Sequence, residues 1–208
     1  METISLMLAL FLLTQSAIYG ADIGQWEVFE TSYTTTKQYA NPFTDLEDNV
    51  VFQHGDQQWI VPAFWAGGDK WTVRFAPPVV GQYQYRVACT DKSNPDMNGG
   101  EQSLRATPYQ ASDPLLKHGF LQVSADHRHF EHADGTAFFW LGDTWWKGLT
   151  KRIPFEDFQQ LAADRKAKGF TVVQIVAGPY PDEPPFDPRW ANEGGMPYEK
   201  DYVRVNPK

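Results

Sequence analysis

A carboxylate and two indoles stand together in residues 138–146, which read FFWLGDTWW. Asp143 can accept hydrogen bonds from sugar hydroxyls, and the faces of Trp145 and Trp146 can cover a sugar ring. The apolar first half of the run predicts a buried strand, which would bring these three side chains just past a strand end. The combination indicates a sugar-binding site.

Four further side chains are candidates to contact a sugar: Gln174, Asp182, Trp190 and Glu193. The residues of the run also have structural interpretations. Asp143 can bind sugar hydroxyls, cap a turn, or take part directly in acid–base chemistry. Trp145 can stack on a sugar or pack under a loop, whereas Trp140, inside the predicted strand, fits packing better.

The segment after Thr150 has a helical period. Pro154 stands at a first helical position, acidic residues follow it, and Lys166 and Lys168 precede Gly169. Acidic residues at the start, basic residues at the end and a glycine stop together predict a helix over residues 154–168. The apolar, β-branched residues that follow, 170–176, predict a buried parallel strand. Strand, helix and strand make a βαβ unit.

The first half of the chain has a β pattern. Residues 71–75 and 82–87 alternate apolar and polar side chains, and Pro77, Pro78 and Gly81 between them predict a turn. Further strands are predicted at residues 25–31, 50–54, 58–64 and 102–106. Short strands at this spacing predict an antiparallel, immunoglobulin-like β-sandwich. Its core is predicted to hold four tryptophans: Trp26, Trp59, Trp65 and Trp71.

A polar segment with a proline near each end, residues 107–114, predicts a linker. Beyond it, residues 120–123 and 129–132 predict a hairpin-like pair, and Asp134-Gly135 predicts a tight turn. The predicted divisions of the chain are a signal peptide over residues 1–21, the sandwich over 22–112 and a second domain over 113–208.

Composition narrows the class of protein. The chain has 208 residues, of which 42% are hydrophobic, and a formal net charge of −8. This charge argues against nucleic-acid binding, which normally needs a basic face. An apolar stretch at residues 4–13, too short to span a membrane, predicts a signal peptide cleaved near Gly20 and a secreted or periplasmic protein. A short buried helix of the mature protein is the alternative. Cys89 is the only cysteine, so no intrachain disulfide can form.

Three histidines, His127, His129 and His132, lie close in sequence to Asp126. Metal ligands must converge on one point. Strand alternation would place residues 129 and 132 on different faces of the strand, so these histidines are not predicted to bind a metal. No cofactor is predicted for the chain.

Longer motifs resemble a known family. In the first half they are WEVFETSY, ANPFTDLE, VPAFWAGGDKWTVRFAPPVVGQYQY and the later Gly99-Gly100. In the second half they are DGTAFFWLGDTWW, FQQLAADRKAKGFTVVQ and GPYPDEPPFDPRWANEGG. Over roughly residues 25–208, the chain resembles the N-terminal part of an apiosidase-like glycoside hydrolase, with the β-sandwich domain of unknown function that often precedes its catalytic domain.

The resemblance implies that the second domain is the truncated start of a (β/α)8 TIM barrel, a fold of about 250 residues. Residues 137–208 would supply its first strand, first helix, second strand and the loop that follows. The family's two catalytic carboxylates lie on later strands, and no residue of this sequence matches them, so catalytic residues are expected beyond residue 208. Gln174 could point into the barrel or belong to a polar layer.

The chain is therefore expected to be an inactive fragment of an exported glycoside hydrolase that acts on plant or microbial polysaccharide. It would contribute an accessory sandwich and part of the sugar site, with a polysaccharide or oligosaccharide as its partner. The alternative is a non-catalytic module, in which the sandwich binds carbohydrate or serves as an accessory domain.

Overall fold

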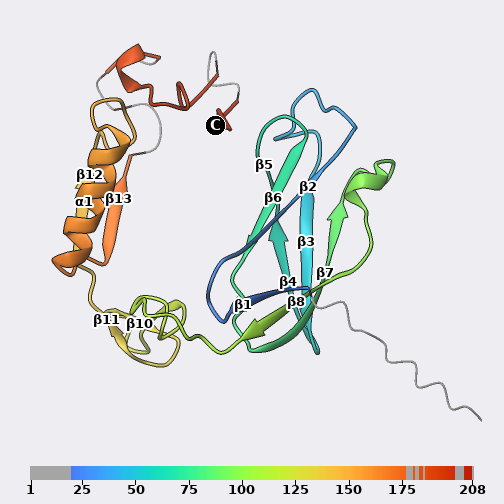
Figure 1. Cartoon of the computed structure of the whole chain (residues 1–208), viewed down its shortest axis with the longest axis horizontal. Helices are drawn as coiled ribbons and strands as arrows, with labels where there is room; N and C mark the ends of the chain where they lie inside the picture. The colour runs from blue at the N-terminus through green and yellow to red at the C-terminus, as the bar shows by residue number, and fades with distance from the viewer. Residues whose placement is uncertain (1–19, 177–179, 181–182, 185, 200–203, 208) are drawn as a thin grey trace, which may run out of the picture.

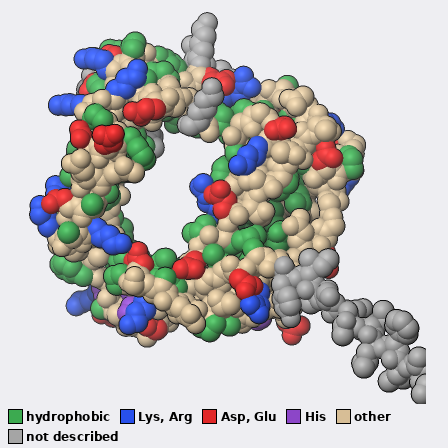
Figure 2. All heavy atoms as spheres, viewed as in Figure 1, with side chains coloured by type: hydrophobic (Ala, Val, Ile, Leu, Met, Phe, Trp, Pro, Cys, Tyr) green, Lys and Arg blue, Asp and Glu red, His purple; other side chains and the backbone are tan. Residues whose placement is uncertain are grey.

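The computed structural model describes residues 20–176, 180, 183–184, 186–199 and 204–207. The chain forms a β-sandwich, a small three-stranded sheet and an α/β segment, which follow one another around an open centre (Figures 1 and 2). On the face seen in Figure 2, acidic and basic side chains are interspersed over all three parts. No helix among the described residues is long and apolar enough to cross a membrane.

The sandwich consists of two sheets. The larger sheet has the order β1-β8-β7-β3-β4, with β1 (Ala21–Gly24), β3 (Asp48–His54), β4 (Gln57–Pro62), β7 (Gly81–Cys89) and β8 (Gln102–Thr107). The smaller sheet has the order β2-β6-β5, with β2 (Phe29–Thr34), β5 (Phe64–Trp65) and β6 (Lys70–Phe75). All pairs are antiparallel except β1 with β8, which are parallel, so the prediction of a wholly antiparallel sandwich was wrong at this edge.

Aromatic side chains from both sheets fill the space between them. Phe52 and Tyr83 have no exposed surface, and Phe52 stacks on Phe75 of the smaller sheet with ring centroids 4.1 Å apart. The Tyr83 hydroxyl donates to the carbonyl of Val79 at 2.8 Å and accepts from its amide at 3.1 Å, which fixes the turn before β7. Alternating strand residues thus form one apolar core, as the sequence pattern predicts.

The strand predicted over residues 25–31 begins later than expected. Trp26 has a positive φ of 67° and lies in a turn, where its amide donates to the carbonyl of Pro77 at 3.0 Å. Its ring faces Tyr109, with centroids 6.5 Å apart, and it is not among the residues of the core. The assignment of Trp26 to the core was therefore wrong, because the turn redirects its side chain toward the segment after β8.

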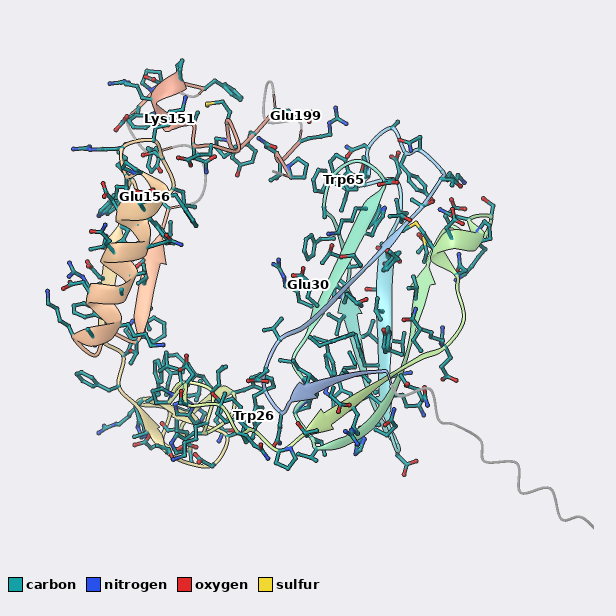
Figure 3. The ribbon with its side chains drawn as sticks, in the orientation of Figure 1. Trp26, Glu30, Trp65, Lys151, Glu156 and Glu199 are labelled. Atoms are coloured by element: carbon teal, nitrogen blue, oxygen red, sulfur yellow. The ribbon has the colours of Figure 1, made fainter. Side chains whose placement is uncertain are left out.

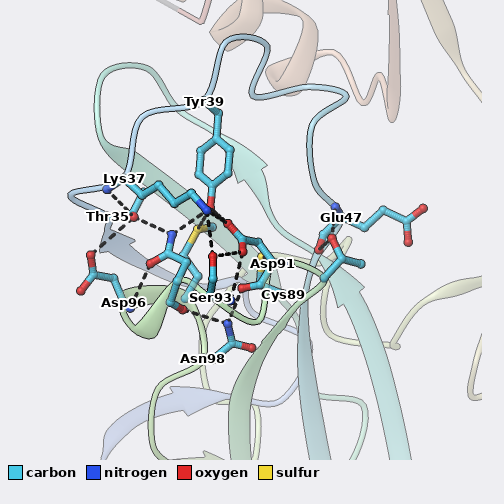
Figure 4. A network of polar contacts seen from close by, with 12 residues as sticks. Thr35, Lys37, Tyr39, Glu47, Cys89, Asp91, Ser93, Asp96 and Asn98 are labelled. Carbon is cyan, nitrogen blue, oxygen red and sulfur yellow. Dashed lines mark hydrogen bonds and ion pairs between the residues drawn. The ribbon is translucent and has the colours of Figure 1, made fainter.

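A polar network fixes the loops at one end of the sandwich (Figure 4). Asp91, after β7, accepts hydrogen bonds from Lys37 Nζ at 2.5 Å, Tyr39 Oη at 2.8 Å and Ser93 Oγ at 2.7 Å. These bonds, that of Lys37 foremost, hold the pKa of Asp91 well below its ordinary value. The network ties the loop between β2 and β3 to the loop that contains the short helix η1 (Pro95–Met97).

The small sheet has the order β11-β10-β9, with β9 (Leu121–Val123), β10 (Phe130–His132) and β11 (Ala137–Phe138). The predicted hairpin-like pair and turn are confirmed. Gly135 adopts a φ of 84°, and its amide donates to the carbonyl of His132 at 2.9 Å.

The α/β segment consists of β12 (Gly142–Trp145), α1 (Phe155–Ala167) and β13 (Val172–Ile175), and the two strands pair in parallel. The helix agrees with its prediction, and Gly169 ends it with a φ of 81°. A short helix, η2 (Pro188–Trp190), follows. A βαβ unit is confirmed, while the barrel implied by the resemblance stays a prediction.

The apolar first half of the run at residues 138–146 does not form a buried strand, so that prediction was wrong. Phe138 ends β11, and residues 139–141 lie between two sheets, with Phe139 74% and Trp140 57% exposed. Thr171 holds this crossing, because its hydroxyl donates to the carbonyl of Phe139 at 2.7 Å and accepts from the amide of Leu141 at 3.1 Å. Asp143 and Trp145 consequently lie within β12 rather than past a strand end.

Candidate functional site

The pairing of β12 with β13 sorts the candidate residues onto two faces. Gly142 lies beside Val172, and Thr144 lies beside Gln174. Since successive strand residues point to opposite sides, Asp143 and Trp145 share one face and Thr144 and its neighbour Gln174 share the other. Helix α1 connects the strands and packs on the first of these faces, as the contacts of Asp143 and Trp145 show.

Asp143 is engaged by residues of this chain. Its Oδ2 accepts from Arg165 Nε on α1 at 2.6 Å and from Trp145 Nε1 at 3.2 Å. The Arg165 guanidinium is the main cause that holds the pKa of Asp143 below its ordinary value. These contacts favour a structural role for Asp143, although they tie β12 to α1 and do not cap a turn. Its binding of sugar hydroxyls stays a prediction.

Trp145 packs under the helix. It is 7% exposed, and its ring meets that of Phe158 edge to face at a centroid distance of 5.2 Å. A ring enclosed in this way cannot stack on a sugar. The prediction that Trp145 provides a stacking face was wrong, because residue 145 falls on the side of β12 that α1 covers.

An open cavity of about 500 Å³ lies along β12 and β13. The residues that line it are Trp140, Gly142, Asp143, Thr144, Val172, Val173 and Gln174. A Cβ at residue 142 would come within 3.3 Å of Trp140 Nε1, so the glycine lets the indole lie close to the strand. Trp140, which the sequence assigned to packing, offers an exposed ring beside a hydroxyl and an amide. We call these residues, Trp140, Thr144 and Gln174, the strand surface.

Beyond the strand ends, Lys147 is held between two rings. Its Nζ lies 3.8 Å from the ring centroid of Tyr180 and 3.7 Å from that of Trp190, and it pairs with Glu183 Oε1 at 2.5 Å. Both rings also line a cavity of about 220 Å³ with Tyr198 and other tail residues. A cation between two aromatic faces fixes the loop that starts after β12 against the tail.

The other candidates occupy different places. Trp146 follows β12 and is 60% exposed, so its ring is free to meet a ligand. Trp190 belongs to the Lys147 cluster, and its Nε1 is buried with no hydrogen-bond partner among the described residues. Glu193 is exposed and lines a separate cavity beside Phe158. Asp182 lies outside the described residues.

The histidines make separate contacts. His132 Nδ1 lies 2.9 Å from the carbonyl of Gly119, and His129 Nδ1 lies 3.5 Å from Asp126. His127 adopts a φ of 59° in the turn between β9 and β10. Within the part of the chain that the structure describes, no three potential ligands cluster around one point.

Sequence reasoning missed three residues that contact the candidate residues: Arg165, Lys147 and Tyr180. Arg165 belongs to the basic last turn of the predicted helix, and a basic residue there suggests only an interaction with the helix dipole. Its pairing with Asp143 depends on how α1 packs on β12. Lys147 and Tyr180 are separated by more than thirty positions along the chain, and no local pattern connects them.

The fold and the strand surface define a modular protein in which a β-sandwich precedes an α/β segment with an exposed aromatic site. Comparison with protein families agrees with both parts. Residues 22–90 match DUF5060, a domain of unknown function, and residues 124–206 match the catalytic domain of the apiosidase-like family. The resemblance stated from the sequence is confirmed.

Among solved structures, the chain is similar to that of a candidate glycoside hydrolase from Bacteroides vulgatus, with a TM-score of 0.64 and 24% sequence identity. The similarity covers 90% of this chain and 37% of that one, so this chain spans just over a third of the length of its structural relative. At this identity the comparison establishes the fold alone. A search of curated proteins gave no match.

Proposed function

We propose that this chain is part of an exported glycoside hydrolase that acts on plant or microbial polysaccharide. In this proposal, residues 22–112 form an accessory sandwich, and residues 113–208 provide the first strands of a (β/α)8 barrel with part of its sugar site. The match of residues 124–206 to the apiosidase-like catalytic domain supports the proposal. The order of sandwich, β-strand, helix and β-strand fits it as well.

The strand surface is the observation that carries the proposal. An exposed indole can cover the C–H face of a sugar ring, while a hydroxyl and an amide beside it can bond to sugar hydroxyls. Trp140, Thr144 and Gln174 provide these groups around one cavity. In a barrel, the face of β12 and β13 that α1 leaves uncovered would be the interior face.

Asp143 is unsuited to be the general acid of such an enzyme. A glycosidase acid must hold its proton near neutral pH, which requires a raised pKa. The pKa of Asp143 is lowered, chiefly by Arg165, so this carboxyl is ionised. We therefore assign Asp143 the role of positioning β12 against α1, and we expect the catalytic pair elsewhere in the enzyme.

Binding and hydrolysis test the proposal separately. Titration of the 208-residue chain with oligosaccharides released from pectin and hemicellulose should show binding that Trp140→Ala and Gln174→Ala weaken about tenfold. Phe155→Ala, at a position on α1 that is 62% exposed, is the matched control and should bind normally. If Trp140→Ala and Gln174→Ala bind the oligosaccharides as tightly as the control does, the strand surface is not the sugar site. The 208-residue chain should release no reducing sugar, and a measurable rate would contradict the expectation that the catalytic pair is absent.

Export is tested by N-terminal sequencing of secreted material. The apolar stretch at residues 4–13 supports cleavage near Gly20, and an intact Met1 in the exported protein would exclude it.

A second candidate function is a sugar-binding module formed by the sandwich itself. The observation that favours it is a cavity at one end of the sandwich, lined by aromatic side chains and a buried carboxylate.

A further inference from the structure

The sandwich contains a cavity of about 390 Å³ at the corner where the chain passes from β4 to β5. Since β4 belongs to the larger sheet and β5 to the smaller one, the cavity lies where the chain crosses from one sheet to the other. Four aromatic residues line this corner cavity: Phe43, Phe64, Trp65 and Trp71. Phe43 belongs to the loop between β2 and β3, Phe64 and Trp65 form β5, and Trp71 belongs to β6.

The rings of the corner cavity differ in their exposure. Trp71 is 4% exposed and belongs to the sandwich core, whereas Phe43 and Phe64 are 42% and 39% exposed at the mouth. Phe43 and Trp65 meet edge to face with centroids 5.4 Å apart. Trp65 Nε1 donates to the carbonyl of Gly68 at 3.0 Å, which fixes the indole in its orientation. The mouth is thus a preformed aromatic surface, and Trp65 both packs against the sandwich core, as predicted, and lines the cavity.

A buried carboxylate lies in the wall of the same cavity. Asp48, the first residue of β3, is 4% exposed. The Tyr33 hydroxyl donates to its Oδ2, but its Oδ1 is buried and has no hydrogen-bond partner among the described residues. A buried carboxylate oxygen without a donor destabilises the protein unless something supplies one. The sandwich therefore retains an unsatisfied acceptor beside an aromatic surface.

We propose that the corner cavity binds a single sugar ring of a glycan chain. One face of the sugar ring would lie on Trp65, with Phe43, which stands nearly perpendicular to that indole, against the edge of the sugar. A sugar hydroxyl would bond to Asp48, directly or through one water molecule. The choice of a sugar as ligand rests on the proposed function. The lining itself disfavours anions, because Glu47 and Asp48 are its charged members. A wholly apolar ligand would leave Asp48 Oδ1 without a donor.

The cavity also lies toward the α/β segment. The sandwich end that carries Trp65 is on the same side of the molecule as the carboxyl end of β13 and the segment that carries Glu199 (Figures 1 and 3). The two parts approach closely there, since a Cβ at Gly67 would lie 3.3 Å from Pro207 Cγ. A glycan held by the sandwich would therefore extend toward the face on which a barrel presents its active site.

The experiment uses saturation-transfer NMR of the 208-residue chain with glucose, galactose, xylose, arabinose, rhamnose and apiose, each at millimolar concentration. At least one sugar should receive saturation from the protein. Trp65→Ala and Phe43→Ala should each weaken that binding about tenfold, because the first removes the stacking face and the second removes the ring against the edge of the sugar. Ile60→Ala, on β4 and 63% exposed, is the matched control and should leave binding unchanged. Circular dichroism of each variant confirms that the sandwich is folded.

Asp48→Asn keeps the shape of the side chain and should weaken the same signal, because an amide group replaces the free acceptor. Absence of transfer to every sugar would overturn the proposal, as would binding that survives both aromatic substitutions. Choline that binds to the wild type and is lost with Trp65→Ala, without any sugar signal, would show an aromatic cation site instead. Trp140→Ala separates the two proposals. If this substitution abolishes sugar binding and those in the corner cavity do not, the sugar binds at the strand surface and the corner-cavity proposal is wrong.

Discussion

Asp48→Asn should change how the stability of the sandwich depends on pH. Burial raises the pKa of Asp48 from 3.8 to about 6, and the hydrogen bond from Tyr33 opposes this only in part. The folded protein therefore keeps the Asp48 proton at pH values at which the unfolded chain has lost it. Its contribution to stability is complete below pH 3.8 and is lost as the pH rises through 6.

The size of the effect follows from this interval. Each pH unit between the two pKa values corresponds to about 1.4 kcal/mol, or about 3 kcal/mol in all. Part of this is already lost at pH 4, so the free energy of unfolding should fall by about 2.5 kcal/mol between pH 4 and pH 7 through Asp48 alone. Asparagine does not titrate. It keeps an oxygen for Tyr33 but buries an amide group without an acceptor, which costs about 1–3 kcal/mol at every pH.

Urea denaturation followed by circular dichroism at pH 4, 5, 6 and 7 measures both effects. The wild type should lose its advantage over Asp48→Asn as the pH rises, so that the difference between their unfolding free energies narrows by about 2.5 kcal/mol. Other titrating groups are common to both proteins and cancel in this difference. Parallel pH profiles would refute the assignment of a raised pKa to a buried Asp48.

Three further substitutions test the packing. Tyr83→Phe should cost about 1–2 kcal/mol in urea denaturation, because it removes a buried hydroxyl that both donates and accepts, and an unchanged midpoint would contradict this. Trp145→Ala should destabilise the α/β segment by about 3 kcal/mol, seen as faster hydrogen exchange in β12, and normal protection there would show that the ring is not needed. Arg165→Met should also speed exchange in β12, whereas Lys166→Met should not. The wild type should lose the protection that Arg165 provides only as the pH falls below 3.8, because the pKa of Asp143 is lowered.

Local patterns predicted the elements of the fold well. Alternation located the strands that became β6, β7 and β8, and the charge order with Pro154 and Gly169 located α1. The failures lie where distant segments decide the conformation. The parallel pairing of β1 with β8 joins residues more than eighty positions apart, and no local pattern indicates it.

The conformation of the candidate site differs from the one that the sequence predicted. Residues 138–146 were recognised as an aromatic and acidic run, yet its apolar first half was taken for a buried strand that ends before Asp143. The run instead contributes to two sheets, because Phe138 ends β11 and residues 142–145 form β12. Residues 139–141 connect the two strands and leave Trp140 exposed. A pattern of apolar residues cannot distinguish one long strand from two short ones that belong to different sheets.

The sequence by itself determined the residue types and their order: a β-rich first half, a βαβ unit in the second half, and tryptophans beside an acidic residue. The tertiary structure decided which of these side chains can meet a ligand. Packing of α1 on β12 turns Asp143 and Trp145 toward Arg165 and Phe158, and it leaves Trp140 on the open side. The physical reason is strand alternation: a shift of one residue moves every side chain to the other face, and only the covering helix fixes which face is buried.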